Sequence, residues 1–135
     1  MPDSHETNQH PGILIAVSAE ILYLLNLLLL PGLAFLALLI LWQIKAKHCP
    51  PLAKAHLQQT IVASLWAGVM LVIVNITIIL LGGYDGPWIW VIVIIYFTIC
   101  HAALVLLGAY GLSKALAGQC WRFPLVGLSL PEGCH

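Results

Sequence analysis

Three long apolar tracts dominate the chain and limit it to one class of protein. They cover residues 12–44, 61–81 and 87–113, and Glu20 is their only charged residue. Each tract reaches or exceeds the roughly 20 residues with which an α-helix crosses about 30 Å of hydrocarbon. The sequence therefore predicts an all-α integral membrane protein, a bundle of three transmembrane helices.

The composition supports this prediction and excludes two broad classes of function. Charged residues make up 7% of the chain, against about 25% in a soluble domain. Five Lys and Arg residues balance five Asp and Glu residues, so no cationic excess is present to bind nucleic acid. No nucleophile with a neighbouring base, no carboxylate pair and no phosphate-binding glycine loop is found. We therefore expect neither enzymatic activity nor a cofactor.

The first tract is too long for one straight crossing at about 1.5 Å per residue. It contains Pro31 followed by Gly32. Proline lacks an amide donor and crowds the preceding turn, so a break is expected here. We predict two segments, 13–30 and 33–46, of one bent crossing. A reentrant first segment is the alternative.

The distribution of cations predicts the orientation. With three crossings, all Lys and Arg residues fall on one side of the membrane, and the positive-inside rule places that side in the cytoplasm. The sequence therefore predicts a non-cytoplasmic tail at 1–11, a three-span domain at 12–125 and a cytoplasmic tail at 126–135, that is, N-out and C-in. The cations are Lys45, Lys47, Lys54, Lys114 and Arg122.

Small residues recur at helical spacing on the second and third spans. Ser64 and Gly68 lie on the second span, and Gly108 and Gly111 on the third. Small residues let helices approach closely in lipid. We expect these positions to pack the second and third spans together; association between copies of the chain is the alternative.

Three of the polar side chains within the apolar tracts are candidate functional residues: Glu20, Asn26 and His101. An ionisable residue at membrane depth is a functional-site hypothesis by default. We expect Glu20 to be protonated, paired or next to a wet cavity. We interpret His101 as a structural or interface histidine, with a proton or ligand relay and a haem or metal ligand as alternatives.

The cysteines form no C-x-x-C pair, and Cys49, Cys120 and Cys134 fall in segments predicted to be cytoplasmic. Thiols stay reduced in the cytoplasm, so no disulfide is expected. The spacing of the cysteines matches no known zinc motif, and we predict no metal site.

Several short stretches resemble a known family. Residues 118–125 read Gly-Gln-Cys-Trp-Arg-Phe-Pro-Leu, which is similar to the Gly-x-x-aromatic-Arg-Tyr-Pro-Leu ending of a group of small bacterial membrane proteins. Pro31, Leu-Trp-Gln-Ile-Lys at 41–45 and His-Leu-Gln-Gln-Thr at 56–60 resemble that group's Pro, Trp-Leu-Ile-Lys and His-x-x-Gln-Ala elements. The chain thus resembles the Tic-twenty-like family, which is related to the twenty-kilodalton membrane subunit of the chloroplast inner-envelope import translocon.

The resemblance implies a multi-pass protein of the bacterial inner membrane. We expect a non-enzymatic accessory protein that binds other membrane or exported proteins, pilin-type substrates included, and assists their translocation, insertion or assembly. Homo- or hetero-oligomers are compatible with this role. The alternative is an accessory subunit of a larger redox or respiratory complex, in which His101 or Glu20 would touch a cofactor or a proton route.

The motif stretches after the first and third spans should meet at the cytoplasmic surface. They would form either a lid over the helix bundle or a docking surface for a partner. The residues assigned to this lid or surface are His56, Gln58, Gln59, Trp121, Arg122, Phe123 and Pro124.

Overall fold

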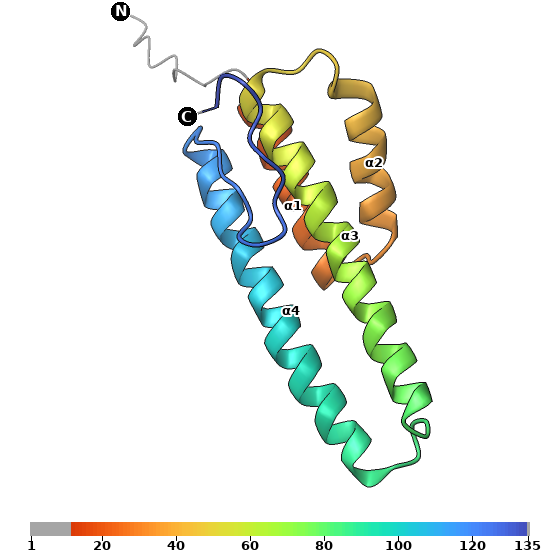
Figure 1. The fold of residues 1–135 in the computed structure, drawn as a ribbon. Helices are drawn as coiled ribbons and strands as arrows, with labels where there is room; N and C mark the ends of the chain where they lie inside the picture. Colours follow the sequence, from red (N-terminus) through yellow and green to blue (C-terminus); the bar gives the residue numbers. More distant parts are fainter. Residues whose placement is uncertain (1–11, 135) are drawn as a thin grey trace, which may run out of the picture.

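The chain folds into α-helices, with no β-sheet in residues 12–134, the part that the computed structural model describes. The short helices pack beside the long ones (Figure 1). The all-α prediction is confirmed. The helices are α1 (Ile13–Leu28), α2 (Leu33–Lys45), α3 (Pro51–Leu80) and α4 (Pro87–Leu116).

The predicted break at Pro31 is confirmed, but the chain does not continue in the same direction after it. Between α1 and α2, Gly32 adopts a φ of +86°, a conformation that suits glycine. The Asn26 side chain stabilises this turn, because its Oδ1 accepts a 2.9 Å hydrogen bond from the Gly32 amide. The chain reverses here, so α1 and α2 form an antiparallel hairpin (Figure 1).

Both α1 and α3 start at the same end of the molecule. Gly12, just before α1, lies against the first turn of α3, where a Cβ built on Gly12 would fall 2.9 Å from the Ala53 Cβ. The C-terminal segment lies at this end too (Figure 1). The prediction of one bent crossing by the two segments is therefore wrong, because it requires α1 and α2 to continue in one direction. The chain reversal is the feature that the reentrant alternative requires.

All Lys and Arg residues still lie at this end of the molecule, because they end or follow α2, open α3, or lie in the last turn of α4 or after it. We call it the cationic end. It is defined by Lys45, Lys47, Lys54, Lys114 and Arg122.

The four helices fall into two length classes. α3 and α4 have 30 residues each, about 45 Å at the helical rise, and both are long and apolar enough to cross a membrane. Each starts with a proline, Pro51 or Pro87, a position where the missing amide costs little. α1 and α2, with 16 and 13 residues, are about 24 and 20 Å long, less than a hydrocarbon core.

The packed core lies toward the cationic end, where α1 contacts both α3 and α4. Beyond the hairpin, the two long helices leave most of their apolar side chains exposed. Three clusters hold the packed end together. Ala16, Leu52 and Ala115 join α1, α3 and α4. Ala19, Leu38 and Leu57 join the first three helices, and Tyr23, Ala63 and Phe123 join α1, α3 and the C-terminal segment.

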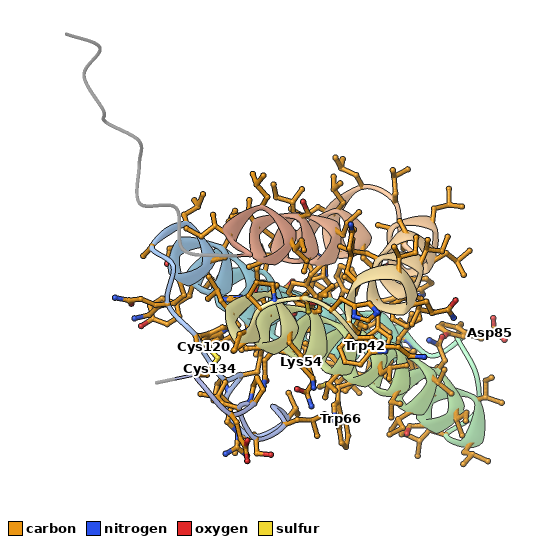
Figure 2. All side chains as sticks on the ribbon, turned by 90° about the horizontal axis from the view of Figure 1, so that it is seen from above. Trp42, Lys54, Trp66, Asp85, Cys120 and Cys134 are labelled. Carbon is orange, nitrogen blue, oxygen red and sulfur yellow. A yellow bond between two sulfur atoms is a disulfide. The ribbon has the colours of Figure 1, made fainter. Side chains whose placement is uncertain are left out.

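The C-terminal segment, residues 117–134, turns back over α3 and α4 (Figure 1). A disulfide joins Cys120 to Cys134 within it (Figure 2), whereas Cys49 and Cys100 are free. The prediction of reduced thiols is wrong. It considers only the compartment, while the fold brings the Cα atoms of the two cysteines within 5.7 Å.

Candidate functional site

A buried polar cluster at the cationic end joins three parts of the chain. Glu20 from α1 and His56 from α3 are fully buried, and Oε1 of Glu20 lies 2.6 Å from Nδ1 of His56. On the other side of the imidazole, Nε2 lies 2.9 Å from the Gln119 carbonyl oxygen in the C-terminal segment. One imidazole on α3 therefore links α1 to the C-terminal segment.

The hydrogen-bond partners fix the number of protons in the Glu20–His56 pair. A carbonyl oxygen only accepts hydrogen bonds, so Nε2 of His56 carries a hydrogen and donates it to Gln119. The Nδ1–Oε1 contact then needs one more proton, held either by the imidazole or by the carboxyl group. In both arrangements the pair carries no net charge, so its burial in an apolar environment costs less free energy than the burial of an unpaired charge.

Gly111 on α4 makes room for the carboxyl group. A Cβ at this position would lie 2.8 Å from Oε2 of Glu20, closer than such atoms approach. Oε2 itself has no hydrogen-bond partner among residues 12–134. The absence of a side chain at Gly111 thus leaves room beside α4 for the Glu20 carboxyl group.

The C-terminal segment is fixed to α3 by the Gln59 side chain. Its Nε2 donates a 2.7 Å hydrogen bond to the Leu128 carbonyl, and its Oε1 accepts one of 3.3 Å from the Phe123 amide. Gly127 must lack a side chain here, because a Cβ would collide with Oε1 of Gln59. Gln59 is fully buried, so both of its polar ends are used inside the protein.

Replacement of Gln59 by Ala should loosen this segment. The Phe123 amide and the Leu128 carbonyl would lose their partner, at a cost of about 1–3 kcal/mol. We expect faster tryptic cleavage after Arg122 in detergent, followed by mass spectrometry. The matched control is Gln58→Ala, because Gln58 is partly exposed. Equal cleavage of both variants would contradict the role of Gln59.

The remaining residues of the predicted lid divide into inward and outward groups. Phe123 is buried edge-to-face against Tyr23, with ring centroids 5.5 Å apart. Trp121 is half-buried and contacts Tyr110. Arg122 is exposed, but its Nε donates a 2.9 Å hydrogen bond to the Gly127 carbonyl. Pro124 and Leu125 are exposed, with Leu125 at a φ of +69°.

The inward positions are those expected of a lid over the helix bundle. The contacts of His56, Gln59 and Phe123 are all internal, so these side chains offer no free surface to a partner. Arg122 and Pro124 are exposed, and Gln58 and Trp121 are partly exposed.

The small residues do not pack as the sequence predicts. Gly108 and Gly111 of α4 receive α1, since a Cβ at Gly108 would lie 2.6 Å from the Tyr23 ring. A Cβ built on Gly68 of α3 would meet no atom within 4 Å. The predicted contact of α3 with α4 through these glycines is therefore wrong, because the reversed α1 occupies the face of α4 that carries them.

An apolar groove with a volume of about 800 Å³ lies between the α1–α2 turn, α3 and α4. Gly68 and Ala67 form part of its α3 wall, and Tyr96 and His101 part of its α4 wall. The His101 ring is stacked on Phe97, with centroids 4.8 Å apart and planes inclined by 10°.

The polar side chains that line the groove are Asn26, Ser64, Tyr96 and His101, together with the thiol of Cys100. Asn26 already accepts the hydrogen bond that closes the α1–α2 turn. Glu20 lies outside the groove, in the buried cluster. The intramembrane polar residues predicted from sequence therefore belong to two separate sites.

Sequence reasoning missed the parts of the cluster that depend on the fold. Gln119 contributes through its backbone carbonyl, which no side-chain pattern reveals. Tyr23, whose hydroxyl donates to the Leu104 carbonyl, and Gly127, which lies against Gln59, belong to no sequence motif. The signal that could have found the pair is Glu20, the one charged residue in the apolar tracts, because such a group in a membrane takes a partner.

Among residues 12–134, no group of three His, Cys, Asp or Glu side chains could hold a metal ion. Comparisons of the chain with protein-family models, curated proteins and solved structures gave no match. A functional assignment therefore depends on the geometry of the groove and the buried cluster.

Proposed function

We propose that this chain is a non-enzymatic accessory protein of the bacterial inner membrane that binds a transmembrane segment of another membrane or exported protein. Such binding would assist translocation, insertion or assembly of that protein. The observation that carries the proposal is the groove, a helix-packing surface that the described part of the chain leaves unfilled. The resemblance of residues 41–45, 56–60 and 118–125 to the Tic-twenty-like family supports the same role.

In this proposal α3 and α4 cross the bilayer, and the α1–α2 hairpin enters it from the cationic end and returns. Helices satisfy their own backbone hydrogen bonds in lipid. The turn at Gly32 is supported by Asn26, as reentrant backbone requires.

The cationic end faces the cytoplasm, because all Lys and Arg residues lie there and none at the α3–α4 turn. The Cys120–Cys134 disulfide at this end favours an oxidising compartment instead. The cations decide the proposed orientation, because Lys and Arg residues act while the chain inserts into the membrane, whereas a disulfide forms after the chain has folded.

Reporter fusions should therefore place both ends of the chain on the cytoplasmic side and Asp85, in the α3–α4 turn, on the other side. The measurement is activity of a compartment-dependent reporter fused to each end or inserted beside Asp85. Opposite sides for the two ends would contradict the hairpin. A consistent exterior location of both ends would reverse the orientation but keep the fold.

Gly68 gives the test of partner binding. A photo-reactive amino acid at Gly68 should cross-link to a protein in native membranes, whereas one at Leu106, an exposed α4 position outside the groove, should not. Gly68→Leu should reduce recovery of that protein. Overpacking costs about 1–3 kcal/mol, which corresponds to roughly 5- to 150-fold in affinity.

Mass spectrometry after gentle-detergent purification would identify the protein. Cross-links from Leu106 at the same yield as from Gly68, or no protein cross-link at all, would refute binding in the groove.

The position of His101 supports a second candidate, an accessory subunit of a redox complex. His101 lies on the groove wall, where a cofactor of a neighbouring subunit could reach it. A visible absorption band in the complex purified from native membranes, lost in His101→Phe, would favour this candidate over the first.

A further inference from the structure

The Cys120–Cys134 disulfide closes the C-terminal segment on itself at the cationic end (Figure 2). Both cysteines are partly exposed, so the bond is not sealed inside the protein. With this end in the cytoplasm, as proposed above, the bond faces a compartment in which glutathione and thioredoxin keep thiols reduced. Disulfides that form there are usually transient, and they are catalytic or redox-sensing.

Residues 129–134 depend on the disulfide for their attachment. No side chain in this stretch is buried, and its backbone hydrogen bond stays within the stretch. The stretch meets a helix at the start of α3, where the Cys134 Sγ lies 3.4 Å from the Pro51 carbonyl oxygen. Residues 123–128 are held differently, because Gln59 forms hydrogen bonds to both of their ends.

The other cysteine connects the disulfide to the buried polar cluster. Cys120 packs against the apolar cluster that contains Leu52 and Ala115. The residue before it, Gln119, accepts the 2.9 Å hydrogen bond from Nε2 of His56 through its carbonyl oxygen. Movement of Cys120 would therefore displace the acceptor on which the buried imidazole depends.

We propose that the Cys120–Cys134 disulfide is a site of thiol–disulfide exchange with a thiol reductant of the cytoplasm, and that its reduction loosens the C-terminal segment. This inference rests on the orientation in the proposed function, because the reductant has to reach the cationic end. Gln59 and Phe123 are buried while the segment is closed. A loosened segment would expose them, so the same residues form a lid in the oxidised protein and a docking surface in the reduced one.

The exchange needs two thiols from the reductant. The thiolate of the first attacks one sulfur of the disulfide, forms a mixed disulfide and releases the other cysteine as a thiolate, which takes up a proton. The second thiol of the reductant then attacks the mixed disulfide. Two electrons and two protons pass to Cys120 and Cys134, and the reductant leaves as its own disulfide.

Cys49 lies at the same end but is not the attacking thiol. Its thiol donates a 3.7 Å hydrogen bond to the Ala46 carbonyl, and partial burial raises the pKa of the Cys49 thiol. The thiolate is the reactive form in disulfide exchange. Cys49 therefore leaves the reaction to an external reductant, and Cys49→Ser is the matched control.

The first experiment measures the redox state. The full-length protein in detergent is equilibrated with reduced and oxidised glutathione at ratios that cover the cytoplasmic range. The thiols are then trapped with acid, alkylated in denaturant and counted by mass spectrometry. Cys120 and Cys134 should pass together from disulfide to alkylated thiols within this range, whereas alkylation of Cys49 should not follow the ratio.

The second experiment measures the release of the segment. The oxidised protein is compared with a variant that carries Cys120→Ser and Cys134→Ser, so that no reductant meets the protease. Tryptic cleavage after Arg122 should be about 10- to 100-fold faster in the variant, because a disulfide across a loop of this length disfavours opening by up to about that factor. Oxidised Cys49→Ser should be cleaved at the rate of the parent protein.

Four outcomes would overturn the inference. A disulfide that persists at every glutathione ratio is a permanent structural bond, and one that is reduced at every ratio controls nothing. Equal cleavage of the oxidised protein and the double serine variant would show that the bond does not hold the segment. Reporter fusions that place both ends of the chain outside the cytoplasm would remove the reductant, but they would leave partner binding in the groove standing, which cross-linking from Gly68 tests separately.

Discussion

Glu20→Ala should destabilise the folded chain by about 3–5 kcal/mol, the usual cost of removing one partner from a buried ionisable pair. His56 would remain fully buried, with Nδ1 facing a cavity in place of the carboxyl group. The imidazole would also hold Gln119 less firmly, so the C-terminal segment should loosen together with α1. The measurement is the free energy of unfolding in mixed detergent micelles, followed by tryptophan fluorescence.

A double-mutant cycle separates the pair from general packing. Glu20→Leu and His56→Leu should each be strongly destabilising, but the double variant should lose far less than their sum, because no polar group is left unpaired. Asn26→Ala is a useful comparison, since it breaks only the turn between α1 and α2. Additive effects of Glu20→Leu and His56→Leu would contradict a direct interaction.

The element types could be predicted from the sequence because they depend on local properties. Uninterrupted apolar tracts produce α3 and α4, and Pro31 with Gly32 ends the first helix. The direction of the chain after the break depends instead on tertiary contacts, which include the Asn26–Gly32 hydrogen bond at the turn and the packing of Leu38 against α1 and α3. No periodicity or composition encodes that direction.

Because the predicted direction of α1 is wrong, the contact between Glu20 and His56 could not be predicted from the sequence either. With α1 crossing the membrane, Glu20 lies in the outer half of the bilayer and His56 near the cytoplasmic surface, so the two cannot meet. With α1 reversed relative to that prediction, they come within hydrogen-bond distance. The motif residues Gln59 and Phe123 were correctly expected near each other, because both positions lie at the cationic end in either arrangement.

Gly111→Ala should destabilise the protein by about 1–3 kcal/mol, the usual cost of overpacking. The new methyl group would fall 2.8 Å from Oε2 of Glu20, at a place where the Glu20–His56 pair leaves no freedom to move. Gly68→Ala is the matched control, because it makes the same change in a helix of the same length at a position with open space. It should be neutral or stabilise the helix by up to about 1 kcal/mol.

The opposite signs expected for these two substitutions test the packing of α1 against α4. In both cases alanine improves helix propensity, so only the surroundings distinguish them. The cost of Gly111→Ala should fall when Glu20 is also replaced by Ala, because the carboxyl group that the methyl group meets is then gone. Unfolding in mixed micelles gives all four free energies of this cycle. If Gly111→Ala were as harmless as Gly68→Ala, α1 would not lie against α4, and the hairpin, the buried pair and the open groove would have to be rebuilt together.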